Sequence, residues 1–214
     1  MSSKTLAWMV EYSVFALLVL VTWVWGSELD WDFADMDRLD VFPLLGLIAF
    51  VTMWWHFLVG FVRRLKPDYE KLEGLHLTSA YWVFAAFTLH PALFLSWGLQ
   101  NGYGWSLYDL VDDYADDAKY PFVVLGLLSL IAFVLFDVAR VLGRMAWAKR
   151  AWPFIDALSD IAFIGIWIHS LNLGQHLEEG WFRTFWLILG LSGICFIIYK
   201  RYRLSRDGKL GRPA

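Results

Sequence analysis

Residues 74–93 read GLHLTSAYWVFAAFTLHPAL. The stretch contains no Asp, Glu, Lys or Arg, and a helix needs about 20 mostly apolar residues to cross a hydrocarbon layer roughly 30 Å thick. It therefore predicts a membrane-spanning helix. Two of the five histidines of the chain, His76 and His90, lie within it. An imidazole in lipid is costly unless it faces the bundle interior, so both histidines are candidate functional residues.

The whole chain has the composition of a membrane protein. Of its 214 residues, 59% are hydrophobic and 19% aromatic, and only 18% are charged, with a mean hydropathy of +0.50. Apolar runs of spanning length recur along the chain and predict an all-α, polytopic bundle of six transmembrane helices in one domain, residues 1–214. The expected spans are about 7–26, 41–62, 75–98, 120–142, 154–173 and 181–199.

These spans leave no stretch for a soluble domain. A nucleotide, flavin or peptide substrate would therefore be handled by another chain. We expect membrane lipid and a protein redox partner or larger membrane complex as partners, and no nucleic acid.

The connections between the spans alternate in charge. Basic residues gather at both termini and in the connections after the second and fourth spans, whereas the segments 27–40, 108–119 and 176–180 are acidic. Because cytoplasmic loops keep Lys and Arg, both termini are expected in the cytoplasm, with the protein integral to a membrane of the bacterial inner type. The acidic loops are either solvated caps or a docking face for a cationic partner, and His176 is expected at the surface of the last one.

The histidines are spaced for a cofactor inside the bundle. Fourteen residues turn an ideal helix through about 1400°, so His76 and His90 share nearly one face and lie about 21 Å apart, one near each leaflet. His169 falls late in the fifth span, which runs in the same direction as the third, so it matches the depth of His90. Two imidazoles from facing helices are a suitable axial pair for the iron of haem b. Zinc would need further ligands, and the only cysteine is Cys195.

The chain resembles the ferric reductase-like transmembrane domain family, which includes the haem-binding membrane subunit of the methionine sulfoxide reductase system and the membrane cores of NADPH oxidases. The resemblance rests on RRLKP before the third span, on LEGLHLTSAYWVFAAFTLH within it, and on WPFIDALSDIAFIGIWIHSL in the fifth span. It covers roughly residues 40–200. It implies six helices, cytoplasmic termini, and paired histidines on the third and fifth helices that hold one haem near each leaflet.

The fifth span departs from the family pattern at its cytoplasmic start. Family members read Trp-x-x-Leu-His there, whereas this chain reads Trp152-Pro-Phe-Ile155-Asp156. Asp156 therefore replaces the inner axial histidine, and Asp160 lies one turn later on the same face. We expect one haem b, held by His90 and His169, and the replacement argues against a second one at His76.

Three alternatives remain open for the inner site. His76 could hold a haem with His56 of the second span as a substitute ligand. His76 could instead pair with Asp156 through a charge-assisted hydrogen bond, which is the alternative we prefer. Thirdly, Asp156 and Asp160 could admit protons beside a quinone site, with His56 or His76 as the proton acceptor.

The sequence thus favours an electron-transfer membrane subunit without a catalytic soluble domain of its own. It would carry electrons towards the outer face, and a quinol or a cytoplasmic partner would supply them. The alternative from another class is a subunit that has lost haem and now anchors or scaffolds a larger complex. A proton-coupled transporter using Glu11, Asp156 and Asp160 is weaker, because these carboxylates lie at span ends and the sequence contains no inverted repeat.

Overall fold

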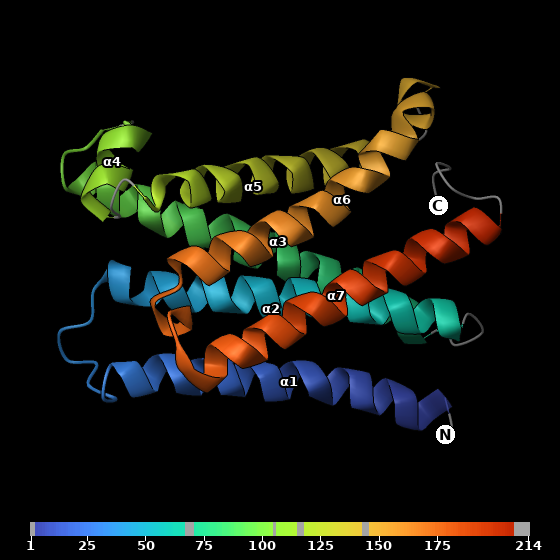
Figure 1. The fold of residues 1–214 in the computed structure, drawn as a ribbon, viewed down its shortest axis with the longest axis horizontal. Coiled ribbons are helices and arrows are strands. Elements are labelled where there is room, and N and C mark those ends of the chain that lie inside the picture. The colour runs from blue at the N-terminus through green and yellow to red at the C-terminus, as the bar shows by residue number, and fades with distance from the viewer. Residues whose placement is uncertain (1–2, 67–70, 105, 115–117, 143–145, 208–214) are drawn as a thin grey trace.

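The computed structural model describes residues 3–66, 71–104, 106–114, 118–142 and 146–207. Within these residues every regular element is a helix (Figure 1). Six of the helices are long and apolar enough to cross a membrane, which confirms the predicted all-α membrane fold. The helices are α1 (Ser3–Glu28), α2 (Arg38–Leu65), α3 (Lys71–Gln100), α4 (Leu107–Tyr114), α5 (Tyr120–Val141), α6 (Ala146–Leu173), the 3₁₀ helix η1 (Gln175–Leu177) and α7 (Gly180–Arg206).

The ends of the helices differ from the expected spans in ways that local chemistry explains. The second helix begins at Arg38 because Asp37 caps it. The Asp37 side chain accepts hydrogen bonds from the backbone N–H groups of Leu39 and Asp40, and the Asp40 side chain accepts one from the backbone N–H of Asp37. The last helix continues to Arg206, well past the predicted end of its span. Lys and Arg are good helix formers and are favoured at a helix C-terminus, so the basic tail extends the helix.

The long helices lie side by side, and successive spans run in opposite directions (Figure 1). The start of α1 and the end of α7 therefore lie at one end of the bundle, together with the ends of α2 and α5 and the starts of α3 and α6. We call this the inner end, because its basic segments are those expected in the cytoplasm. The α1–α2 connection, α4 and η1 lie at the other end, which we call the outer end.

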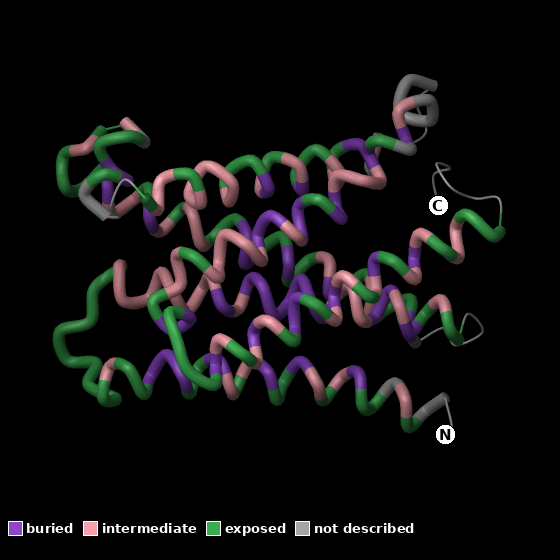
Figure 2. The backbone as a smooth tube through the Cα atoms, viewed as in Figure 1, coloured by how far each residue is buried: buried purple, intermediate pink, exposed green. Residues whose placement is uncertain are grey.

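Helix α2 forms the centre of the bundle. It packs against α1, α3, α6 and α7, and its middle third is almost entirely buried, with Phe50, Val51 and Met53 fully enclosed. Figure 2 shows buried residues concentrated along α2 and on the faces of the helices that cross it. The position of α2 matters for function because it carries residues that contact histidines at both ends of α3.

The outside of the bundle is apolar. On α1 the large side chains of one face are exposed, namely Trp8, Tyr12, Phe15, Val19 and Trp23, which recur every three or four residues. A soluble protein rarely exposes so large an apolar patch. This face is therefore suited to contact with lipid, in agreement with the membrane assignment.

Candidate functional site

The outer histidine pair, His90 on α3 and His169 on α6, lies inside the bundle. Each ring lies against a glycine of a neighbouring helix. The ring of His90 packs on Gly46 of α2, where an added Cβ atom would lie 2.9 Å from Cε1, and the ring of His169 packs even more tightly on Gly126 of α5.

Each histidine of the outer pair donates a hydrogen bond to a backbone carbonyl of the helix against which it packs. Nδ1 of His90 lies 3.1 Å from the carbonyl oxygen of Phe42, and Nδ1 of His169 lies 2.7 Å from that of Phe122. A carbonyl can only accept, so the proton of each neutral imidazole is on Nδ1 and the lone pair is on Nε2. Both rings are thereby held in the tautomer that a metal ligand needs.

The two halves of the outer pair share one local arrangement. Phe42 stands four residues before Gly46 in FPLLG, and Phe122 stands four residues before Gly126 in FVVLG. One turn of helix thus supplies both the carbonyl that orients an imidazole and the gap that admits it. Our sequence reasoning missed these four residues, although the repeated Phe-x-x-x-Gly pattern was visible in the chain.

The donor set of the outer pair fits haem iron. A porphyrin supplies four nitrogen ligands, so two neutral imidazoles complete the coordination of the iron. Among the described residues, no group of three or more His, Cys, Asp or Glu side chains could hold a metal ion alone. The outer pair is thus suited to a metal that arrives inside a macrocycle.

At the inner end, the structure places His56 and His76 side by side. Their rings stack with centroids 4.1 Å apart and planes 13° from parallel. Nδ1 of His56 lies 2.8 Å from the hydroxyl of Ser79, which donates to the backbone carbonyl of His76. A metal held in line between two imidazoles sits about 2 Å from one nitrogen of each, with the rings end to end. Face-to-face stacking does not fit two axial ligands of one iron.

Asp156 and Asp160 form ion pairs with α7. Lys200 Nζ lies 2.5 Å from Asp160 Oδ1 and 3.6 Å from Asp156 Oδ1. Arg201 Nη1 lies 2.6 Å from Asp156 Oδ2, and Arg201 Nε donates to Asp160 Oδ2 over 2.7 Å. Asp156, which we expected to pair with His76, has Lys200 and Arg201 of α7 as its ion-pair partners.

Lys200 and Arg201 belong to the basic C-terminal segment, which the sequence indicates as a topology determinant and an anchor for lipid headgroups. Their role as partners of Asp156 and Asp160 was missed, because the partners are about forty residues apart. The sequence did contain a signal for these ion pairs. Asp156 and Asp160 lie one turn apart in one apolar span, and the adjacent cations Lys200 and Arg201 lie at the inner end of another.

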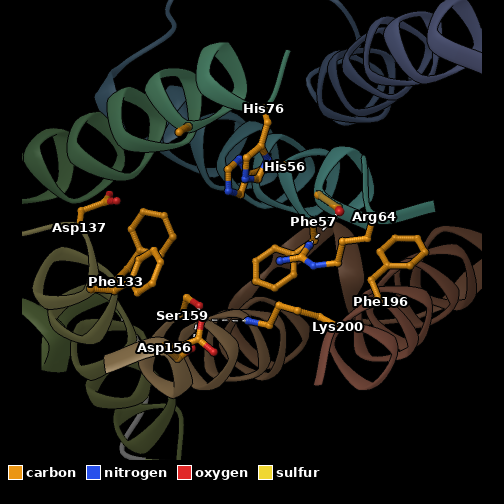
Figure 3. Close-up of a pocket in the computed structure, with 13 residues that line it drawn as sticks. His56, Phe57, Arg64, His76, Phe133, Asp137, Asp156, Ser159, Phe196 and Lys200 are labelled. Atoms are coloured by element: carbon orange, nitrogen blue, oxygen red, sulfur yellow. Dashed lines mark hydrogen bonds and ion pairs between the residues drawn. The ribbon is translucent and has the colours of Figure 1, made fainter. Parts of the chain in front are cut away.

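These inner residues surround a small pocket with a cavity volume of about 100 Å³. Figure 3 shows the two histidines on one wall, Lys200 and Asp156 on the facing wall, and Arg64 extending between them. Asp160 lies just beside it, held by the same lysine. The inner pocket is lined by His56, Phe57, Gly60, Arg64, His76, Ala80, Phe133, Phe136, Asp137, Asp156, Ser159, Phe196 and Lys200.

At the outer end, His176 does not lie at the surface as expected. It belongs to η1, is buried, and forms an ion pair with Glu28 at the end of α1. The η1 segment folds back against α1, α6 and α7 and carries the histidine inward. The acidic side chains around it are exposed, including Asp30, Asp35 and Glu178. Asp116 and Asp117 lie outside the described residues.

We compared the chain with protein-family models, with curated proteins and with solved structures, and none of the three comparisons gave a match. The class of protein that the fold defines is an all-helical integral membrane protein with six candidate spans. The resemblance to the ferric reductase-like family rests on the sequence motifs quoted above.

Proposed function

We propose that this chain is a membrane haem b protein that carries electrons towards the outer end of the bundle, with His90 and His169 as the axial ligands of one haem. The observation that carries the proposal is the matched orientation of the two imidazoles. Each is half-buried between helices, and each donates its Nδ1 proton to a carbonyl, which leaves Nε2 for iron.

The protein's part in this function is to hold and orient the cofactor. When bound, haem b supplies reversible one-electron chemistry at its iron. His90 and His169 set the depth of the site, and the carbonyls of Phe42 and Phe122 fix their tautomers. The surrounding apolar side chains exclude water. Gly46 and Gly126 allow the histidine-bearing helices to approach.

The donor and acceptor follow from the position of the outer pair. With a single haem near the outer leaflet, a cytoplasmic flavin would lie nearly a full membrane away, so a quinol within the bilayer is the more suitable donor. The acidic loops at the outer end would face a cationic or metal-bearing acceptor. The membrane that fits this arrangement is a bacterial inner membrane, with both termini in the cytoplasm.

The test is the visible spectrum of the purified protein, oxidised and reduced with dithionite, together with the number of haems per chain. We expect sharp reduced-minus-oxidised bands and one haem per chain. His90→Ala and His169→Ala should each abolish the bands. His76→Ala is the matched control, because it removes an imidazole from the same helix as His90 and should leave the bands in place.

A second candidate function is favoured by the inner end. Its histidines stack on each other, and Asp156 and Asp160 have their ion-pair partners on α7, so these side chains are held by contacts within the chain. This arrangement suits a subunit that anchors or scaffolds a larger complex without haem. A colourless wild type, produced with sufficient haem supply, would exclude the electron carrier and leave this second function.

A further inference from the structure

The charged side chains around the inner pocket are not all paired with one another. Arg64, Lys200 and Arg201 contribute three positive charges, and Asp137, Asp156 and Asp160 contribute three negative ones. Asp156 and Asp160 are both engaged by the cations of α7. Asp137 lines the other side of the pocket (Figure 3) and has an interaction of its own.

Of the three cations, Arg64 is the one that forms no ion pair with a carboxylate of the described residues. Its Nη1 donates to the carbonyl oxygen of Gly60 over 2.8 Å, which uses one of the five N–H groups of the guanidinium. Among the described residues, no carboxylate lies within ion-pair distance of Arg64. A charge that is half-buried without a counter-ion is unfavourable, so an anion in the pocket would stabilise the protein.

The rest of the lining selects the kind of anion. Four phenylalanines from three helices face the pocket: Phe57, Phe133, Phe136 and Phe196. The cavity volume of about 100 Å³ is smaller than that of pockets that enclose a whole ligand, roughly 300–1,000 Å³, so only the head of a ligand would lie within it. The pocket also lies at the end where α2 reaches its final turn and the basic part of α7 begins, which is the depth of lipid headgroups. A ligand with an anionic head and an apolar body fits this lining.

We propose that the inner pocket binds the phosphate of an anionic phospholipid, with Arg64 as the cation that holds it. Basic pockets between transmembrane helices on the cytoplasmic side are known to take such headgroups. The planar guanidinium matches a phosphodiester, whose two free oxygens can each accept an N–H. The lipid would occupy the part of the bundle from which the inner haem ligand is missing. The proposal does not depend on haem at the outer pair.

The test measures the thermal unfolding of the full chain in a neutral detergent while lipid is added. Phosphatidylglycerol should raise the unfolding temperature in a saturable manner, whereas phosphatidylcholine, which has no net charge, should have little effect. Inorganic phosphate alone should not reproduce the shift. If inorganic phosphate acts equally well, the site is a plain anion site and the assignment to lipid is wrong.

Adjacent arginines provide the matched variants. Arg64→Gln should weaken the apparent affinity for phosphatidylglycerol about tenfold or more, the effect of losing a hydrogen bond between charged groups. Arg63→Gln removes the same charge one residue earlier, from an exposed side chain that pairs with Glu73, and should change the affinity by less than about twofold. Equal losses in the two variants would show only general attraction to a basic surface and would overturn the proposal.

Two further measurements keep the test decisive. If Arg64→Gln does not fold, Arg64→Lys can replace it, because lysine keeps the positive charge but lacks the planar guanidinium. Native mass spectrometry of Arg64→Lys should then find fewer bound lipids than in the wild type. A soluble quinone analogue is the competing ligand. If it stabilises the wild type and Arg64→Gln equally, and His56→Ala removes the effect, the pocket is a quinone site and the lipid proposal is wrong.

Discussion

A single methyl group decides whether His169 can lie where it does. At Gly126 an added Cβ would overlap the imidazole, so α5 can approach α6 only with glycine at that position. An added Cβ at Gly46 would also crowd the ring of His90, at 2.9 Å from Cε1, which is a smaller overlap than the one at Gly126. Glycine lowers the intrinsic stability of a helix. Here that loss is offset by a tight contact between helices and by a hydrogen bond to the carbonyl one turn earlier.

We therefore predict that Gly126→Ala displaces the ring of His169. The overlap should lower the free energy of unfolding by about 1–3 kcal/mol, as overpacking does in a well-packed interior. If the outer pair holds haem, the reduced-minus-oxidised bands should weaken as well. The measurements are unfolding in detergent and the visible spectrum.

The control for this prediction is Gly74→Ala. Gly74 also lies in a helix, but a Cβ there would meet no atom within 4 Å. This variant should be as stable as the wild type or slightly more so, because alanine favours the helix. If Gly126→Ala and Gly74→Ala changed the free energy of unfolding equally, the contact between Gly126 and His169 would not contribute to stability.

Helices α6 and α7 are joined at the inner end by charge and along their length by small residues. The ring of Phe163 lies against Gly193, and that of Trp167 lies against Gly190. Further inward, Asp160 is 8% exposed and is held by Lys200 and Arg201. Buried charges of this kind are stable only as a set, since removal of one leaves its partners without a counter-ion.

Asp160→Asn should accordingly destabilise the packing of α7 on α6. Breaking a buried ion pair from one side costs about 3–5 kcal/mol, and we expect a loss near the lower end because Lys200 and Arg201 retain Asp156. The loss would be measured as a lower unfolding temperature in detergent.

Asp207→Asn provides the comparison. Asp207 pairs with Arg203 and Arg206 at the end of α7, where its side chain is 38% exposed. Exposed pairs contribute little, so this variant should change the stability by less than about 0.5 kcal/mol. If Asp160→Asn were as mild, the ion pairs would not be what holds the two helices together at the inner end.

For the whole molecule, the distribution of charge and the path of the chain agree. The basic segments gather at the end that contains both termini, and the acidic connections gather at the other end (Figure 1). This polarity predicts that the inner end faces the cytoplasm.

The orientation can be measured with single cysteines. In a Cys195→Ser background, Asp35→Cys should react with a membrane-impermeant maleimide on intact cells, because Asp35 is exposed in the α1–α2 connection. Ser205→Cys, near the end of α7, should react only after the cells are permeabilised. The reverse pattern would contradict the assigned topology.

Much of the fold could be predicted from the sequence alone. Whether a segment crosses a membrane depends on its length and on its own apolar side chains, so the six helices were recognisable without any knowledge of their neighbours. Alternation of charge between the connections likewise predicted both termini at one end. The short helix α4 and the inward fold of η1 were missed, because contacts with distant segments decide them.

The details of the candidate site depended on tertiary structure. The rotation of each helix is set by packing against its neighbours, such as His90 on Gly46 and His169 on Gly126, and apolar composition does not specify it. That rotation brings His90 to a carbonyl 48 residues away and turns Asp160 towards Lys200, 40 residues away. The sequence by itself determined which segments are long and apolar enough to cross a membrane. Only the tertiary structure decided which of them meet, because contacts inside a bundle depend on the angular positions of several helices at once.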